Sequence, residues 1–113
     1  MEINISERNS VAVFSIAGKI DVKTVTKFST ALSETAYRYS KVVVEMREVN
    51  YLSSASIQIL LTVLKICHVR GGDLCLANVQ PNVQRLLRVS GFLSIVQLYD
   101  DVDAAVASFA GKE

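Results

Sequence analysis

Apolar and polar residues alternate near the N-terminus in a pattern that predicts two strands. Ile3 and Ile5 alternate with polar neighbours. In the second run, Val11, Val13 and Ser15 lie on one face, and the other face carries the apolar residues Ala12, Phe14 and Ile16. Residues 7–10 form the expected turn between these runs, and Gly18 ends the second one. The chain therefore opens with two consecutive strands.

A helical period follows this pair of strands. Its apolar positions are spaced by three or four residues and fall at Val22, Val25, Phe28, Leu32, Ala36 and Tyr39. Asp21 precedes the run, where an Asp side chain can accept hydrogen bonds from the unpaired backbone N–H groups of a first helical turn. The spacing predicts an amphipathic helix that Asp21 caps.

A continuous apolar run marks the middle of the chain. Residues 41–46 include three consecutive valines, a pattern typical of a central strand buried on both faces of a parallel sheet. Ser53 and Ser54 follow as good N-capping residues for an apolar helix over 55–69, and two glycines end that helix. The sequence thus predicts a second strand-to-helix unit with serines at its junction.

The remaining third of the chain adds a strand, a helix, a strand and a helix, predicted over residues 74–77, 81–91, 95–98 and 100–109. The whole order predicts one α/β domain over residues 1–113, with a mixed β-sheet of four to five strands covered by about four α-helices. Sites in open α/β sheets lie at the carboxyl ends of strands. We therefore expect the site in the loop before the helix that begins near Ser54.

The composition limits the classes of function. Half of the 113 residues are apolar and 20% are charged, which predicts a folded domain. Twelve basic and eleven acidic residues leave a formal charge of +1, so we expect no broad basic surface for nucleic acid or anionic lipid. The longest apolar stretch, residues 57–69, falls short of the roughly 20 residues of a membrane span. The N-terminus lacks the pattern of a secretion signal, and we expect a cytoplasmic protein.

Residues suited to catalysis or metal binding are few. Cys67 and Cys75 lack the spacing of a metal site, and we expect both to be free thiols. No glycine-rich phosphate loop follows the central strand, and His68 lies late in an apolar helix. Most acidic residues stand at helix starts or beside basic ones. We therefore expect no enzyme activity, no metal and no cofactor.

A cluster of serines offers the remaining chemistry. Ser53, Ser54 and Ser56 stand at the predicted start of the middle helix, where unpaired backbone N–H groups and the helix dipole favour negative charge. A phosphoserine suits this position. The alternative is that Ser53 or Ser54 only caps the helix and the other serines face solvent.

Three segments give the chain a resemblance to a known family. They are Gly18 to Asp21, then Val42 to Val44 followed by Tyr51 to Ala55, and Pro81 to Leu87 with Ser90 to Phe92. In order and spacing they resemble the anti-sigma-factor antagonists of the STAS family along nearly the whole chain. The resemblance implies a non-catalytic protein that binds a protein partner and is switched by serine phosphorylation.

The resemblance also implies the residues and partners of that switch. The family motif Asp-Ser-x-Gly places its phosphorylated serine at Ser54; the kinase is an ATP-dependent anti-sigma factor, and a serine phosphatase reverses the modification. Ser53 occupies the aspartate position and Ser56 the glycine position, which leaves Ser53 and Ser56 as alternative phosphorylation sites. Asp21 matches an aspartate near the phosphoserine, although helix capping explains it equally well. We expect Asp21 and the three serines to form the partner-binding face.

A second hypothesis comes from a different class of function. The same fold can serve as a constitutive subunit of a larger assembly, such as a lipid-transport complex or a stressosome-like particle. That role needs no phosphate. The sequence leaves the partner's identity, the regulated process and the oligomeric state open.

Overall fold

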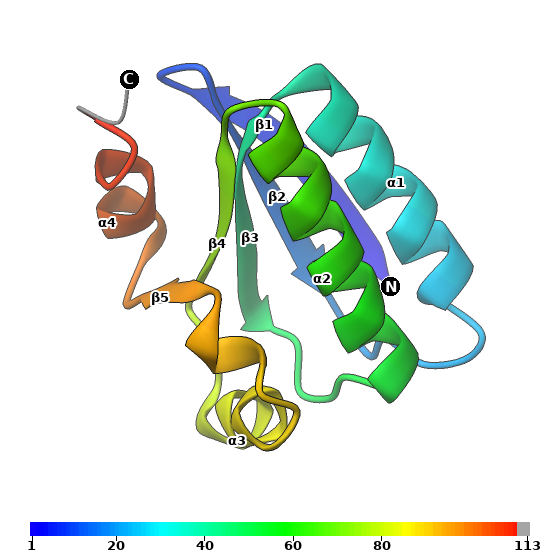
Figure 1. Ribbon diagram of the computed structural model, residues 1–113. Coiled ribbons are helices and arrows are strands. Elements are labelled where there is room, and N and C mark those ends of the chain that lie inside the picture. The colour runs from blue at the N-terminus through cyan, green and yellow to red at the C-terminus, as the bar shows by residue number, and fades with distance from the viewer. Residues whose placement is uncertain (111–113) are drawn as a thin grey trace.

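The computed structural model describes residues 1–110, which form five strands and four α-helices (Figure 1). In chain order these are β1 (Glu2–Arg8), β2 (Val11–Ala17), α1 (Val25–Arg38), β3 (Lys41–Glu48), α2 (Ser54–Val69), β4 (Asp73–Ala77), α3 (Pro81–Val89), β5 (Gln97–Tyr99) and α4 (Val102–Ala107). A 3₁₀ turn, Phe92–Ser94, connects α3 to β5. The predicted order of strands and helices is confirmed.

The strands form one mixed sheet in the order β1-β2-β3-β4-β5. β1 runs antiparallel to β2, and all other neighbouring strands are parallel. Helices α1 and α2 lie side by side over one face of the sheet, and α4 covers part of the other face. Helix α3 lies beyond the carboxyl ends of the parallel strands, at the bottom of Figure 1. This arrangement is the predicted mixed sheet covered by helices.

The sheet separates two apolar cores. On the side of α1 and α2, Phe14 of β2 packs edge-on against Phe28 of α1, with ring centroids 6.1 Å apart. On the other side, Val43 of β3 belongs to a smaller cluster with Val106 and Phe109. All three valines of β3 have no exposed surface. The predicted central strand, buried on both faces, is therefore confirmed.

The start of the first helix differs from the prediction. Helix α1 begins at Val25 with Thr24 at its N-cap, so the expectation that Asp21 caps this helix is wrong. Asp21 instead organises a turn ahead of the helix, and Val22 lies in that turn with 85% of its surface exposed. The sequence misled because Asp accepts hydrogen bonds from nearby backbone N–H groups in turns and in helix caps alike.

The C-terminal elements lie close to their predicted places. Pro81 opens α3 as expected, and Gly91 follows its last turn in the left-handed conformation, with φ of 84°. The 3₁₀ turn that comes next moves the start of β5 to Gln97. Asp101 caps α4 with its side chain. Asp103 lies in the first turn of α4, where a negative charge favours the helix. These two aspartates therefore stabilise the start of α4.

The two cysteines are buried thiols on opposite sides of the sheet. Cys67 lies on the buried face of α2 and belongs to the main core, and Cys75 of β4 belongs to the smaller cluster. Burial, together with the negative charge of Asp73, raises the pKa of Cys67 to about 11. The reactive thiolate form of Cys67 is therefore scarce at neutral pH.

Two adjacent glycines join α2 to β4 for different physical reasons. A Cβ atom added to Gly72 would overlap the backbone of Ser40, whose carbonyl oxygen accepts a hydrogen bond from the Asp73 N–H at 3.0 Å. Gly71 has open space where its Cβ would stand, but its φ of 81° is left-handed. Gly72 is required by the close approach of the Ser40 backbone, and Gly71 by its left-handed conformation.

We predict that Gly72→Ala lowers the free energy of unfolding by about 3 kcal/mol, because its methyl group must displace the backbone of Ser40. Gly71→Ala is the matched control and should cost about 1 kcal/mol, since it only forces alanine into the left-handed region. Urea denaturation followed by circular dichroism measures both losses. Equal losses in the two variants would contradict the steric role of Gly72.

We predict that the native thiols resist a thiol-specific chromogenic reagent at pH 8. With a pKa of about 11, Cys67 is only about 0.1% thiolate at this pH, and burial also blocks the reagent. Both cysteines should react completely once the protein is unfolded in urea. Rapid reaction of either thiol in the folded protein would contradict its burial.

Candidate functional site

Two loops meet at the carboxyl end of the sheet and are joined by backbone pairing. One loop follows β2 and contains Ile20, and the other follows β3 and contains Leu52; these two residues form an isolated parallel bridge. The Ser53 N–H donates to the Ile20 carbonyl oxygen over 3.2 Å. The side chains of Ile20 and Leu52 are both buried. The pairing therefore brings Asp21 into register beside Ser53.

The end of β3 and the loop between β3 and α2 are also held from the side of α3. The Gln80 side-chain amide donates to the Arg47 carbonyl oxygen, and the Asn82 amide donates to the Asn50 carbonyl oxygen, each over 2.7 Å. Val49 is fully buried and anchors the middle of the loop. A loop held at several points has little conformational freedom left to lose when a partner docks. The structure therefore presents this surface already formed.

Ser53 caps α2 as predicted, and Ser56 closes the cap. Ser53 Oγ accepts a hydrogen bond from the Ser56 N–H at 3.1 Å, and the Ser56 hydroxyl donates to the Ser53 carbonyl oxygen at 2.6 Å. Ser56 has no exposed surface, so the alternative in which every serine outside the cap faces solvent is wrong for this residue. Its burial also argues against Ser56 as a phosphorylation site or partner contact.

Ser54 has different surroundings from its two neighbours. It is the first residue of α2, its side chain is exposed, and its hydroxyl makes no hydrogen bond to any residue from 1 to 110. The first turn of α2 contains no acidic residue, so the positive end of the helix dipole is not neutralised within that turn. Unpaired backbone N–H groups there favour an anion. A phosphate on Ser54 would meet favourable local electrostatics.

Asp21 lies in the neighbouring turn, where several hydrogen bonds fix it. Its carboxylate accepts from the Lys23 N–H at 3.0 Å and from the Thr24 N–H at 3.3 Å. The Thr24 hydroxyl donates to the Lys19 carbonyl oxygen and accepts from the Asp21 N–H. The hydrogen bond from Lys23 in particular lowers the pKa of Asp21 from its usual value. Asp21 therefore carries a negative charge at neutral pH.

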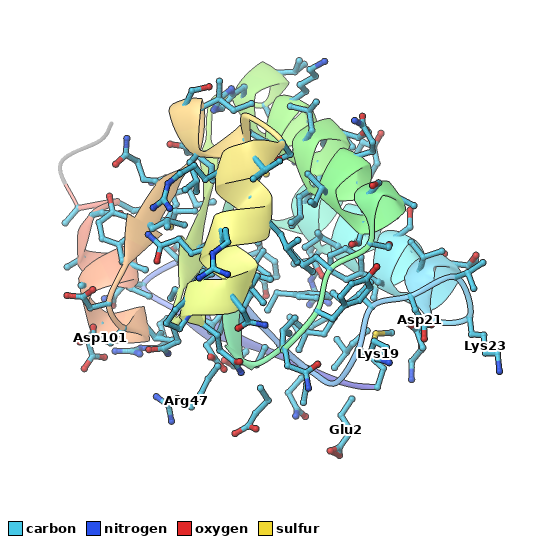
Figure 2. All side chains as sticks on the ribbon, turned by 90° about the horizontal axis from the view of Figure 1, so that it is seen from below. Glu2, Lys19, Asp21, Lys23, Arg47 and Asp101 are labelled. Carbon is cyan, nitrogen blue, oxygen red and sulfur yellow. The ribbon has the colours of Figure 1, made fainter. Side chains whose placement is uncertain are left out.

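Charged side chains are spread unevenly over this end of the molecule. Figure 2 views it from below and shows Lys19, Asp21 and Lys23 together on one side, with Arg47 toward the other. The two lysines flank the aspartate in sequence and share its exposed surface. The face next to Ser53 and Ser54 thus carries charges of both signs.

Two further findings bear on the chemistry of the described residues. Among residues 1–110, no group of three or more His, Cys, Asp or Glu side chains is arranged to hold a metal ion. None of the helices in this part of the chain combines the length and apolar character needed to cross a membrane.

The structure therefore brings three of the four predicted site residues to one accessible face. Asp21 and Ser53 belong to paired loops, and Ser54 is exposed at the next position along the chain. Ser56 lies directly beneath them and supports the cap from inside. The predicted convergence of the two loops is observed.

Sequence analysis missed three residues that position this face. Thr24 ties the Asp21 turn together, and its spacing of three residues from Asp21 was an available signal. Gln80 and Asn82 brace the loop before α2, but a single sequence does not reveal that amides beside a helix start reach so far back along the chain.

Comparison with known proteins gives matches to one family. The STAS domain family matches residues 2–105. The protein BtrV of Bordetella bronchiseptica, named as an anti-sigma factor antagonist, is 35% identical over 69 residues, which cover 61% of this chain and 60% of that protein. The match thus spans less than two thirds of that relative's length. An anti-sigma F factor antagonist of Paenibacillus polymyxa is 23% identical over 103 residues, 89% of this chain and 88% of that protein.

Solved structures share the fold. An anti-sigma factor antagonist of Mycobacterium paratuberculosis has a TM-score of 0.86 at 20% identity, over 95% of this chain and 92% of that one. The antagonist SpoIIAA in its unphosphorylated form has a TM-score of 0.81 at 14% identity, over 97% of each chain. Its phosphorylated form, from Bacillus, has a TM-score of 0.72 at 13% identity, over 95% of this chain and 99% of that one. From these matches and the family match, we conclude that the chain belongs to the STAS domain family and that its named relatives are anti-sigma factor antagonists.

Proposed function

We propose that this chain is a cytoplasmic anti-sigma-factor antagonist that binds an anti-sigma factor serine kinase through Asp21, Ser53 and Ser54. The kinase transfers the γ-phosphoryl group of ATP to Ser54 Oγ, which releases ADP, and a serine phosphatase hydrolyses the phosphoserine. The antagonist itself performs no catalysis. The observation that carries this proposal is the exposed hydroxyl of Ser54 at the start of α2, which makes no hydrogen bond within residues 1–110.

The local hydrogen bonds favour Ser54 over the other two serines. Ser53 Oγ accepts from the backbone of α2, and the Ser56 hydroxyl is buried and donates to a carbonyl oxygen. Phosphorylating either of them would break the cap, which is worth about 1 kcal/mol, and burying a phosphate at Ser56 would cost more. Ser54 can accept the phosphoryl group without losing any of these contacts.

The change of charge explains how phosphorylation would release the partner. A phosphoserine adds a charge of about −1.5 to −2 at pH 7. In the free protein, solvent and the start of α2 stabilise this charge. In the docked complex the same dianion would lose its water and face the negative charge of Asp21 nearby. Phosphorylation therefore weakens the complex more than it perturbs the free protein.

The names of the relatives support an antagonist that is regulated by phosphorylation. The two curated relatives carry antagonist names, and SpoIIAA, which shares the fold, is described in both an unphosphorylated and a phosphorylated form. The departure from the family motif also has a physical account, since Ser53 supplies the helix cap that an aspartate would supply. A side-chain cap of α2 is therefore retained at this position.

We predict that the anti-sigma factor kinases of the source organism include one that phosphorylates the wild-type protein once, at Ser54. Ser54→Ala should remain bound to that kinase in the presence of ATP, and Ser54→Glu should bind at least about tenfold more weakly, because it carries part of the phosphate charge. Mass spectrometry maps the phosphate, and titration calorimetry measures binding.

The matched control is Ser53→Ala, which should lose about 1 kcal/mol of stability but still be phosphorylated. Phosphate on Ser53 or Ser56, or equal binding by wild type, Ser54→Ala and Ser54→Glu, would contradict the proposal. A stable complex in the native cell whose assembly does not change with ATP would instead favour the role of a constitutive structural subunit.

We predict that two substitutions of Asp21 distinguish the effect of its charge on partner binding from its hydrogen bonds in the turn. Asp21→Asn keeps an oxygen that can accept from the Lys23 and Thr24 N–H groups, so the turn and the stability should change little. Asp21→Ala removes both the acceptor and the charge. If the kinase contacts the Asp21 carboxylate directly, both variants bind the kinase about tenfold more weakly. Normal binding by Asp21→Asn would restrict Asp21 to a structural role.

A further inference from the structure

Strand β1 leaves one edge of the sheet open. It is the terminal strand of the sheet and pairs only with β2 through all seven of its residues. The backbone N–H and C=O groups on its other edge have no strand partner within residues 1–110. Proteins often protect such an edge with charged side chains, above all lysine, with proline or with a bulge, because it can pair with another chain. The charged residues of β1 are Glu2, Glu7 and Arg8. The sequence of β1, EINISER, contains neither proline nor lysine, and its ladder with β2 is regular.

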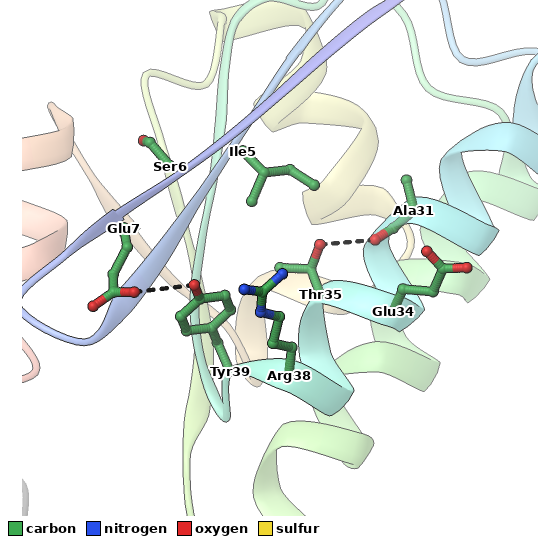
Figure 3. A pocket seen from close by; sticks show the side chains of 8 residues that line it. All are labelled: Ile5, Ser6, Glu7, Ala31, Glu34, Thr35, Arg38 and Tyr39. Carbon is green, nitrogen blue, oxygen red and sulfur yellow. Dashed lines mark hydrogen bonds between the residues drawn. The ribbon is translucent and has the colours of Figure 1, made fainter.

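Helix α1 and its C-cap residue Tyr39 contact the N-terminal segment, residues 1–8, at two points and leave a hollow between them. The Lys27 ammonium contacts the Met1 carbonyl oxygen at 3.4 Å, and the Tyr39 hydroxyl donates to the Glu7 carboxylate at 3.0 Å. The hollow in between has a volume of about 400 Å³ (Figure 3). Ile5 of β1 lies on this hollow and is 50% exposed. An apolar side chain in the middle of an open edge is therefore only half covered.

The charges of β1 follow a pattern that fits its own copy. Glu2 stands at one end of the strand, Arg8 stands at the other, and Ile5 is the central residue. In an antiparallel pair centred on Ile5, residue 2 of one strand lies opposite residue 8 of the other. Each end of such a pair would place a glutamate against an arginine.

We propose that β1 is a self-association surface, on which a second copy of this chain pairs edge to edge about a two-fold axis at Ile5. The two five-stranded sheets then form one continuous sheet. A two-fold axis places the same surface on both partners, so each favourable contact occurs twice. Two Glu2–Arg8 pairs and one contact between the Ile5 side chains define the register.

The two faces of β1 are compatible with this pairing. Ile5 lies opposite Phe14 of β2, on the face of the sheet that α1 covers. The Ile5 side chains of the two copies would therefore meet on that same face. Glu2 and Arg8 point to the opposite face, where Arg8 pairs with Asp103 of α4. The Arg8 side chain is 46% exposed, and its guanidinium has further N–H donors for a second carboxylate. Figure 2 shows Glu2 projecting outward from the molecule.

Sedimentation velocity over concentrations from about 1 µM to about 1 mM tests the proposal. The wild-type protein should form a dimer as concentration rises. Glu2→Arg and Arg8→Glu each replace two attractive pairs by two repulsive ones, and each should weaken the dimer by about tenfold. Mixing these two variants should restore dimers, because every pair across their joint interface is again of opposite charge. The double variant Glu2→Arg/Arg8→Glu should also dimerise like wild type.

Asp103→Asn is the matched control, since it removes the pair with Arg8 inside one molecule and leaves the proposed interface unchanged. It should dimerise like wild type. Circular dichroism confirms that each variant is folded. A wild-type protein that stays monomeric up to the highest concentration would overturn the proposal. So would a dimer that is insensitive to the single charge reversals or is not restored by mixing them.

Discussion

The pairing of Ile20 with Leu52 is the interaction on which the candidate site depends. It extends the parallel sheet by one bridge beyond the ends of β2 and β3, and the Ser53 N–H completes it at the Ile20 carbonyl oxygen. Both side chains belong to the main core, so the burial that stabilises the sheet also fixes the two loops. This bridge holds the Asp21 turn in register with the start of α2.

The hydrogen bonds at the start of α2 then determine what this face can offer a partner. Ser53 and Ser56 satisfy each other, and Ser54 presents its hydroxyl to solvent. This division of roles makes a modification at Ser54 compatible with the intact fold. The proposed pairing edge of β1 shares no residue with this face. Self-association and the phosphorylation switch would therefore use different residues.

Much of this arrangement follows from the sequence, because its strongest signals are local. Apolar patterns, together with caps, proline and glycines, predicted the order of strands and helices; the valines of β3 marked the central strand, and Ser53 and Ser54 were marked as capping residues. Local patterns failed for Asp21, because an aspartate accepts backbone hydrogen bonds in a turn as well as in a helix cap. Asp21 begins a turn three residues ahead of the helix cap. They also failed for the burial of Ser56 and for the amide braces from α3, since both depend on tertiary contacts.

The central claim is that the Ser54 hydroxyl shares one preformed face with the Asp21 turn. It is tested most directly by comparing ¹⁵N–¹H correlation spectra of the unmodified protein and of protein carrying phosphoserine at position 54. The account predicts chemical-shift changes confined to two separate stretches, residues 19–24 and 51–58, with the rest of the spectrum unchanged. Changes spread through the sheet, or a spectrum in which residues 19–24 do not respond, would contradict it.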